Sequence, residues 1–179
     1  MLRCFVCGTA ALREESRKVF EDAFQALIVC QYGLTETLIN SMEGPGEERK
    51  AGSVGRLLGS QIDIVDEAGD SLGLCKLGEL KIRSGGIANG YLPAEGFSSD
   101  AFREGVFYSG DLGCIDEEGY LFLMGRKKNI IVKGGRNIFP KSIDDVILKK
   151  EGIKEVATLG YPDDFYGEEI CSCVVLESK

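Results

Sequence analysis

The sequence contains no histidine among its 179 residues. This absence excludes Ser-His-Asp and Cys-His catalysis within the chain, and any zinc site would need cysteine or carboxylate ligands. There are seven cysteines, and an odd count argues against the disulfide framework of a small secreted protein. Cys4 and Cys7 have the spacing of a thiol redox pair or of half a zinc site, but no second pair of that kind follows, so we favour neither role.

No apolar run approaches the roughly 20 residues that a membrane-spanning helix needs, and the first residues are not built like a signal peptide. These absences favour a cytoplasmic protein. The net charge of −8 predicts repulsion from nucleic acid and from anionic membranes, so any phosphate binding must be local. A basic cluster that could bind phosphate is formed by Arg126, Lys127, Lys128, Lys133 and Arg136. A solvated basic face is the alternative interpretation.

A strand–helix–strand unit is predicted at the N-terminal end. Residues 2–7 form a short apolar run that ends at Gly8, and residues 27–30 form another. Between them, apolar residues recur at helical spacing, which predicts an amphipathic helix with its charges on a solvated face. Its inward face would consist of Leu12, Val19, Phe20, Ala23, Phe24 and Leu27.

The middle of the chain, to about Gly125, has the period-two alternation of β-strands. Residues 61–65 and 79–83 alternate around a turn at 66–70, after a stretch at 41–55 with the composition of an exposed loop. A hairpin over 112–124 turns at 116–119, where Gly119 can adopt a positive φ. This part therefore predicts a small antiparallel sheet or barrel.

A second unit is predicted from Asn129 onwards. Strands at 129–132 and 136–139 flank a Lys133-Gly134-Gly135 turn, and Pro140 then opens a helix over 141–150. The inward residues of this helix would be Ile143, Val146 and Ile147. Two more strands follow at 155–160 and 170–176.

Cys171 and Cys173 alternate within the last of these strands, so both should be small buried residues on one face. The chain stops directly after this strand, and we expect the second unit to be incomplete. The fold class is thus predicted as α+β. It comprises a small antiparallel β-barrel-like subdomain preceded by a strand–helix–strand unit, then an incomplete α+β C-terminal domain.

Polar residues with ligand chemistry follow the apolar run at 27–30. Thr35 can donate a hydroxyl to phosphate, Glu36 is a hard oxygen ligand for Mg²⁺, and Tyr32 offers a flat face to a base. We expect these residues on a loop at the strand end, where ligand-binding groups are common. A plain turn with a chance carboxylate is the alternative.

Asp111 ends the polar stretch Tyr108-Ser109-Gly110-Asp111, expected as a turn just before the hairpin. One carboxylate can accept hydrogen bonds from both ribose hydroxyls, but it can equally cap a turn. Spacing alone leaves these two interpretations about even. The two common nucleotide fingerprints, G-x-x-x-x-G-K-[ST] and G-x-G-x-x-G, do not occur.

Three motifs together carry a resemblance to a known family: Tyr32-Gly33-Leu34-Thr35-Glu36-Thr37, Tyr108-Ser109-Gly110-Asp111 and Gly125-Arg126-Lys127-Lys128-Asn129. With Lys133-Gly134-Gly135-Arg136-Asn137-Ile138 and Gly167-Glu168-Glu169, the chain resembles the adenylate-forming enzymes, and among them the acyl-CoA synthetases. The resemblance covers nearly the whole chain. It implies the last part of a large AMP-binding domain over 1–125, a hinge at 126–128, and the first part of a small C-terminal domain over 129–179.

The resemblance also implies a role for each matching residue. ATP or AMP would be bound by Gly8, Thr9, Ala10, Tyr32, Gly33, Thr35, Asp111 and Arg126. Tyr32 would stack on the adenine and Asp111 would bind the ribose, and the catalytic residues would be Thr35, Glu36 and Arg126. Glu36 would be the Mg²⁺ ligand. Lys128 would be the hinge residue, and Gly134 and Gly135 would line the path of the CoA pantetheine.

Enzymes of this family use MgATP to convert a carboxylic acid to an acyl-adenylate and then pass the acyl group to CoA or to a carrier thiol. The expected function is therefore an ATP-dependent carboxylate–CoA ligase, acting on a fatty or aryl acid in fatty acid metabolism. A carrier-loading acyl-AMP ligase would share every motif here. A non-catalytic nucleotide-binding module that kept the fold is the alternative of a different class.

The sequence departs from the family pattern at four points. Ala11 stands where proline is usual, and Asn129 where an acidic residue is common. The family's glycine-rich phosphate loop and its catalytic C-terminal lysine do not appear. We therefore expect little or no adenylation by this chain alone.

Overall fold

The computed structural model describes residues 3–9, 12–44, 46, 48–91 and 100–177. The chain divides into two compact units, which are described separately. Unit 1 comprises Met1–Ser109 and Gly113–Leu123, and unit 2 comprises Gly110–Leu112 and Met124–Lys179. The described residues form thirteen strands and two α-helices, which confirms the α+β class.

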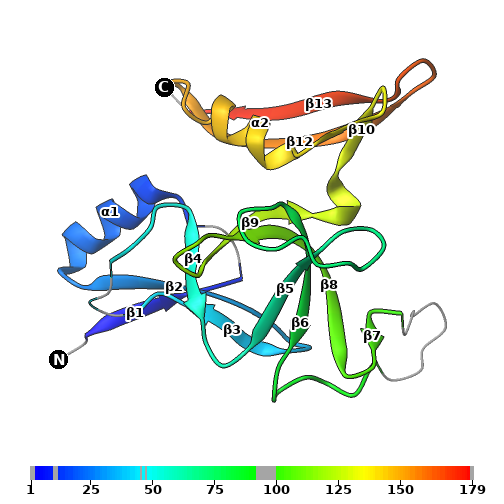
Figure 1. Ribbon diagram of the computed structural model, residues 1–179. Coiled ribbons are helices and arrows are strands. Elements are labelled where there is room, and N and C mark those ends of the chain that lie inside the picture. The colour runs from blue at the N-terminus through cyan, green and yellow to red at the C-terminus, as the bar shows by residue number, and fades with distance from the viewer. Residues whose placement is uncertain (1–2, 10–11, 45, 47, 92–99, 178–179) are drawn as a thin grey trace. The chain divides into compact units, whose positions relative to one another are not determined.

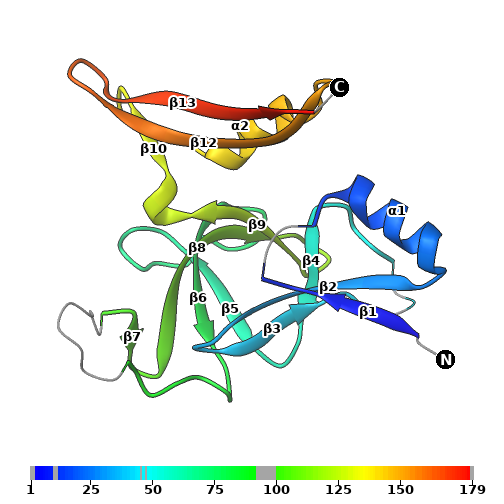
Figure 2. The same cartoon turned by 180° about the vertical axis from the view of Figure 1, so that it is seen from behind.

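Unit 1 begins with the predicted strand–helix–strand unit. Strand β1 (Cys4–Cys7) pairs in parallel with β2 (Leu27–Leu34), and helix α1 (Glu14–Phe24) connects them. Figures 1 and 2 both show α1 lying along this pair of strands. The helix is attached by aromatic packing, since the ring of Phe5 on β1 meets that of Phe20 edge-on with centroids 4.9 Å apart.

The predicted burial of α1 is wrong. Val19 is 70% exposed and Phe24 is 61% exposed, whereas Arg17 is 6% exposed. The side chain of Arg17 reaches back over β2, where Nη1 donates to Glu43 Oε1 at 3.0 Å and Nη2 donates to Glu43 Oε2 at 2.6 Å. The pattern correctly identified an apolar stripe, of which Phe20 packs on Phe5 of β1 while Val19, Ala23 and Phe24 remain exposed.

The Arg17–Glu43 pair is part of a small network of charges. Burial acts to lower the pKa of Arg17, but the hydrogen bond and negative charge of Glu43 outweigh it and raise that pKa above its ordinary value. Glu21 accepts from Arg49 at 2.8 Å and from the Ile28 amide at 2.7 Å. Against the effect of burial, these two hydrogen bonds lower the pKa of Glu21.

The remaining strands of unit 1 extend the sheet in an antiparallel manner. They are β3 (Leu38–Met42), β4 (Ser53–Leu57), β5 (Gln61–Val65), β6 (Gly78–Arg83), β7 (Phe102–Arg103), β8 (Val106–Ile115) and β9 (Tyr120–Arg126). The strand order is β1-β2-β3-β4-β9-β8-β6-β5, with β7 added to β8. The path has two ends in the described part of the chain, so the sheet is open and is barrel-like only in its curvature (Figure 1).

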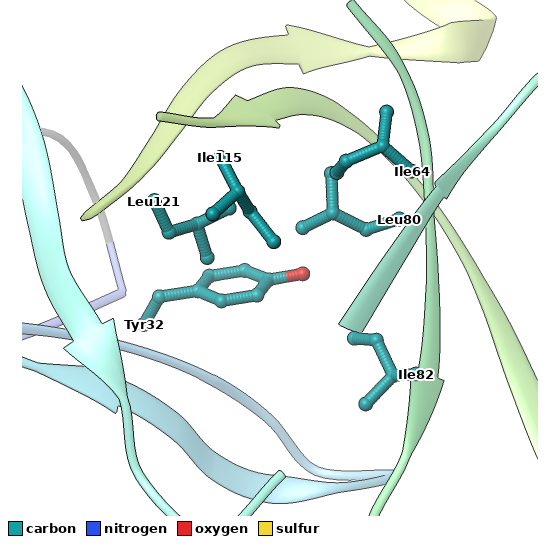
Figure 3. Packing of buried hydrophobic residues seen from close by; sticks show 6 residues of the cluster. All are labelled: Tyr32, Ile64, Leu80, Ile82, Ile115 and Leu121. Atoms are coloured by element: carbon teal, nitrogen blue, oxygen red, sulfur yellow. The ribbon is translucent and has the colours of Figure 1, made fainter. Parts of the chain in front are cut away.

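The strands predicted by alternation at 61–65 and 79–83 are confirmed as β5 and β6, which pair with each other. Ile64 of β5 and Leu80 and Ile82 of β6 form one hydrophobic core with residues of three other strands, Tyr32 of β2, Ile115 of β8 and Leu121 of β9 (Figure 3). The loop predicted at 41–55 is wrong at its ends, which belong to β3 and β4, and Pro45 and Glu47 lie outside the described residues.

The hairpin predicted at 112–124 is confirmed as β8–β9, with Gly119 at φ 83°. Asp116 Oδ1 accepts from the amides of Glu118 and Tyr120 at 3.0 and 2.9 Å, so Asp116 closes this turn. The expected turn at 108–111 is wrong, because these residues continue β8. Asp111 therefore does not cap a turn.

Unit 2 has a four-stranded sheet in the order β11-β10-β13-β12. A short 3₁₀ helix η1 (Lys127–Asn129) leads into it, and its elements are β10 (Ile131–Lys133), β11 (Arg136–Ile138), α2 (Pro140–Ile147), β12 (Ile153–Asp163) and β13 (Gly167–Leu176). Helix α2 packs against β12. As predicted, Pro140 stands at the start of this helix, which ends three residues earlier than expected.

Two burial predictions in unit 2 are wrong. Val146 is 61% exposed, and Cys171 and Cys173 are both exposed. The two cysteines do alternate along β13 as expected. Alternation along a strand shows only that two side chains lie on the same face of the sheet. Whether that face is buried depends on another layer of helices or strands packing against it. Within the described residues, no helix is both long enough and apolar enough to cross a membrane.

We predict that Arg17→Ala will destabilise unit 1 by about 3–5 kcal/mol, because it leaves the Glu43 carboxylate buried without its cation. Urea denaturation followed by circular dichroism would measure this loss. Lys18→Ala, at the exposed neighbouring position, is the matched control and should change the stability by less than about 0.5 kcal/mol. Equal stability of the Arg17 and Lys18 variants would contradict the buried pair.

Candidate functional site

The carboxyl ends of β1 and β2 lie at the same edge of the sheet because the two strands are parallel. Cys7 is in register with Cys30, so Gly8 and Thr9 lie level with Gln31 and Tyr32. A Cβ atom on Gly8 would be 3.1 Å from Gln31 Cγ, and Thr9 has a φ of 73°. The fold thus brings Gly8, Thr9 and Tyr32 together, while Ala10 and Ala11 lie outside the described residues.

Tyr32 lies within β2 and not on a loop, because this strand continues to Leu34. Its side chain is 7% exposed, and its ring packs among the core residues in Figure 3. The ring therefore contributes to the core of unit 1. Adenine stacking by Tyr32 stays a prediction.

Gly33 is required by the close approach of β2 and β3. A Cβ atom at this position would be 2.5 Å from the carbonyl oxygen of Leu38, and the pairing of these strands shifts register between Tyr32 and Gly33. A backbone oxygen cannot move away as a flexible side chain can. The glycine therefore permits the tight hairpin that carries the next two candidate residues.

Thr35 and Glu36 occupy the turn of that hairpin. The turn is anchored by Thr37, which is fully buried and accepts a hydrogen bond from Asn40 Nδ2 at 2.7 Å. The carbonyl of Glu36 accepts from the Ala88 amide at 2.7 Å, and its carboxylate accepts from the Tyr91 hydroxyl at 2.6 Å. These bonds hold Glu36 in place, as a preorganised ligand requires.

Tyr91 is a contact that the sequence reasoning missed. It lies 55 residues from Glu36 along the chain. No local spacing links the two, because β4, β5 and β6 intervene. Only the topology of the sheet brings this hydroxyl to the carboxylate.

Asp111 and Arg126, predicted separately, form an ion pair across β8 and β9. The distance from Arg126 Nε to Asp111 Oδ1 is 2.9 Å. The Asp111 side chain is 9% exposed and that of Arg126 is 49% exposed. Because the contact uses Nε, the two Nη groups of Arg126 remain available to an anionic ligand. The Asp111 carboxylate can accept hydrogen bonds from hydroxyl groups of the same ligand.

Arg126 also lines a groove of about 580 Å³ within unit 2. The groove includes Lys128, Asn129, Lys141 and Asp144. The Oδ1 atom of Asp144 is buried and has no hydrogen-bond partner in the described part of the chain. The groove therefore combines two lysines and an arginine with a carboxylate oxygen that can still accept a hydrogen bond.

Gly134 and Gly135 form the predicted turn between β10 and β11, with φ values of 56° and 78°. Two consecutive positive φ angles are those of a type I′ hairpin, which glycine adopts without strain. The Gly134 amide donates to the Tyr166 carbonyl at 2.9 Å, and Lys133 Nζ lies 5.2 Å from the Tyr166 ring centre. This turn is therefore tied to the β12–β13 connection.

The first 92 residues of the chain match the sequence model of the family described as AMP-binding enzyme. The chain belongs to this family. The match includes β1, α1 and β2 and the turn with Thr35 and Glu36. The match ends before Asp111 and Arg126, so the comparison of these two residues with the family rests on whole-chain relatives.

Relatives extend the likeness over almost the whole chain. The sulfoacetate–CoA ligase of Cupriavidus necator is 34% identical over 94% of this chain and 34% of its own length. The structure of ATP-bound MatB from Rhodopseudomonas palustris has 31% identity and a TM-score of 0.89, over 97% of this chain and 35% of its own. The chain thus spans about a third of the length of these AMP-binding relatives.

A third likeness is to o-succinylbenzoate CoA synthetase, MenE, from Bacillus subtilis in complex with ATP and a magnesium ion. It has 26% identity and a TM-score of 0.83, over 99% of this chain and 37% of that chain. These structural likenesses confirm the fold expected from the resemblance to adenylate-forming enzymes. The related proteins named as ligases attach acids to CoA, and the named acids differ in chemistry.

We predict that Gly33→Ala will destabilise unit 1 by about 1–3 kcal/mol, because the added methyl group overlaps the Leu38 carbonyl. Chemical denaturation monitored by circular dichroism would measure the effect. Gly85→Ala is the matched control, since a Cβ atom at that turn position meets nothing within 4 Å. If both variants were equally stable, the close approach of β2 and β3 would be wrong.

Proposed function

We propose that this chain is part of an ATP-dependent carboxylate–CoA ligase and carries its ATP-binding groups. The observation that carries this proposal is the Asp111–Arg126 ion pair. Asp111 is the expected ribose ligand and Arg126 an expected nucleotide-binding residue. In this member of the AMP-binding family, Arg126 Nε lies 2.9 Å from Asp111 Oδ1. The named relatives that are CoA ligases support the reaction class.

In this proposal each unit carries residues that bind the nucleotide. Gly8, Thr9 and Tyr32 line the adenine at the edge of β1 and β2. The Asp111 carboxylate accepts hydrogen bonds from the ribose hydroxyls. Arg126 pairs with this carboxylate and directs its remaining N–H groups to phosphate oxygen.

Glu36 and Thr35 fit a magnesium ion that arrives with ATP. No group of three or more Cys, Asp or Glu side chains within the described part of the chain could hold a metal by itself. Mg²⁺ commonly needs only one or two carboxylates when phosphates supply the other oxygens. When bound, the ion neutralises charge on the phosphates. Glu36 would be its protein ligand, and the Tyr91 hydrogen bond fixes the carboxylate that receives it.

The chemistry asked of this chain is mainly electrostatic. In adenylation, an oxygen of the substrate carboxylate bonds to the α-phosphorus and the bond to pyrophosphate breaks, so negative charge builds on the leaving group. Arg126 and Thr35 stabilise that charge by hydrogen bonds that strengthen as it develops. In the second step the CoA sulfur attacks the acyl carbonyl and AMP leaves, with Gly134 and Gly135 lining the path of the thiol.

The substrate is proposed to be a fatty or aryl acid. The likeness to an o-succinylbenzoate CoA synthetase, at 26% identity, supports an aryl acid, whereas the sulfoacetate ligase, at 34% identity, acts on an acid of neither class. We also propose that these 179 residues alone catalyse little or no adenylation. The sequence contains neither the glycine-rich phosphate loop nor the C-terminal lysine of the family.

We predict that Glu36→Gln will reduce adenylation at least tenfold, because the amide is a weak ligand for Mg²⁺. The assay is acid-dependent exchange of labelled pyrophosphate into ATP, run over a panel of fatty acids, aryl acids and sulfoacetate. The test protein is a hybrid in which these residues replace the aligned third of the Cupriavidus ligase. The 179-residue chain is assayed beside it.

Glu67→Gln, on the exposed turn after β5, is the matched control for the loss of one carboxylate. Exchange by the unmutated hybrid with any acid, sulfoacetate included, supports the proposal. If a folded hybrid shows no exchange with any acid, the chain is better explained as a non-catalytic nucleotide-binding module.

Lys128 is proposed as the residue at which the backbone turns between the two half-reactions. It is exposed in the short helix η1, a few residues after the boundary at Met124 where unit 2 resumes, and an exposed residue close to such a boundary can absorb a large change in φ and ψ. Proline fixes φ near −65°. Lys128→Pro in the hybrid should therefore lower thioester formation at least tenfold while pyrophosphate exchange changes less than about twofold.

Lys128→Ala removes the same charge but leaves φ free, so this control should retain both half-reactions. The two rates are measured separately, by pyrophosphate exchange and by acyl-CoA formation. An equal loss of both rates in the proline variant would argue against the hinge.

A further inference from the structure

Two cysteine thiols lie opposite each other on the parallel strands β1 and β2. Cys7 is the register partner of Cys30, and both are free and half-buried. Neighbouring strands are about 4.7–4.9 Å apart, which falls within the span of about 4.4–6.8 Å between Cα atoms of disulfide-bonded cysteines. Register partners project to the same face of a sheet, so the two sulfur atoms are neighbours.

The face that carries both thiols is the one covered by α1. Phe5 is two residues before Cys7 and therefore shares its face, and the Phe5 ring packs on Phe20 of α1. Cys4 is three residues before Cys7, so it projects to the opposite face, and its register partner is Leu27. Cys4 and Cys7 are therefore not placed to form a disulfide with each other, although they are close in sequence.

The two thiols differ in their surroundings. The Cys30 amide donates to Glu43 at 2.8 Å, which places this residue beside the buried Arg17–Glu43 pair. Burial, and then the negative charge of Glu43, raise the pKa of the Cys30 thiol. Cys30 is thus the poorer first nucleophile, and Cys7, at the strand end, is suited to react first.

We propose that Cys7 and Cys30 form a redox-sensitive dithiol that hydrogen peroxide converts to an intrachain disulfide. The Cys7 thiolate attacks one peroxide oxygen, the O–O bond breaks, and Cys7 becomes a sulfenic acid while hydroxide leaves. The Cys30 sulfur then attacks the Cys7 sulfur, the S–O bond breaks, and the departing hydroxide takes the Cys30 proton. The hydroxide from the first step takes up the proton that Cys7 lost on ionising, so both thiols are oxidised and one peroxide is reduced to two waters.

A disulfide between Cys7 and Cys30 would lie next to residues that are proposed to bind the adenine. Gly8 and Thr9 directly follow Cys7, and Tyr32 follows Cys30 by two residues. A disulfide fixes the separation of the two strand ends. Under the proposed function these ends line the adenine, so the effect on ATP binding, unlike the bond itself, rests on that function.

The bond is tested by peptide mapping of the whole 179-residue chain. The chain is treated with hydrogen peroxide, remaining thiols are alkylated, and trypsin digestion without reductant is followed by mass spectrometry. The expected product links peptides 4–13 and 19–49, with a loss of about 2 Da from their summed mass, and reductant reverses it. This readout needs neither ATP nor activity.

Substitutions identify the cysteine used in peptide 4–13, which contains both Cys4 and Cys7. Cys7→Ser and Cys30→Ser should each abolish the link, whereas Cys4→Ser should retain it. The proposal is overturned if the link survives Cys7→Ser. It is equally overturned if Cys7 is oxidised only to sulfinic acid, or if peroxide links peptides 57–76 and 104–126, joining Cys75 to Cys114, in preference.

Discussion

The buried ion pair between Arg17 and Glu43 is the interaction on which the arrangement of the N-terminal half depends. Arg17 belongs to α1 and Glu43 directly follows β3, so the pair links the helix before β2 to the strand after it. Its hydrogen-bond partners include the Ile28 carbonyl and the Cys30 amide, both on β2. A buried charge is tolerated only when it is paired and hydrogen-bonded, which fixes α1, β2 and β3 relative to one another.

The candidate site residues depend on this arrangement. Thr35 and Glu36 occupy a turn whose two strands are the ones that the ion pair holds. Gly8 and Thr9 owe their position to the parallel pairing of β1 with β2. Strand pairing thus positions these candidate residues after β1 and in the turn between β2 and β3, without a glycine-rich nucleotide fingerprint.

The sequence predicted those features that depend on local chemistry. Alternation identified β5 and β6, and Gly119 and the Gly134-Gly135 pair identified two hairpin turns whose φ values require glycine. It also supplied the family through motifs whose residues are close in sequence. Contacts such as Tyr91 with Glu36 could not be predicted, because they depend on the non-sequential strand order and curvature of the sheet.

Burial was the least predictable property. The stripe on α1 and the alternation of Cys171 and Cys173 were read correctly as patterns, but both faces are exposed. A pattern shows which side chains share a face and not whether a second layer covers them. In the opposite direction, Arg17 was assigned to a solvated face and is buried, since its partner Glu43 lies in another part of the sequence.

The exposed stripe on α1 affects how this chain will behave with environment-sensitive dyes. Val19, Ala23 and Phe24 line an apolar surface depression beside Phe20 in the folded unit. Dyes such as anilinonaphthalene sulfonate report apolar surface open to water, and their fluorescence is widely used as a sign of a loosely packed state. Here the well-packed native chain already offers such a surface. Dye fluorescence would therefore not distinguish folded from partly unfolded protein, and loss of near-ultraviolet dichroism is the sounder criterion.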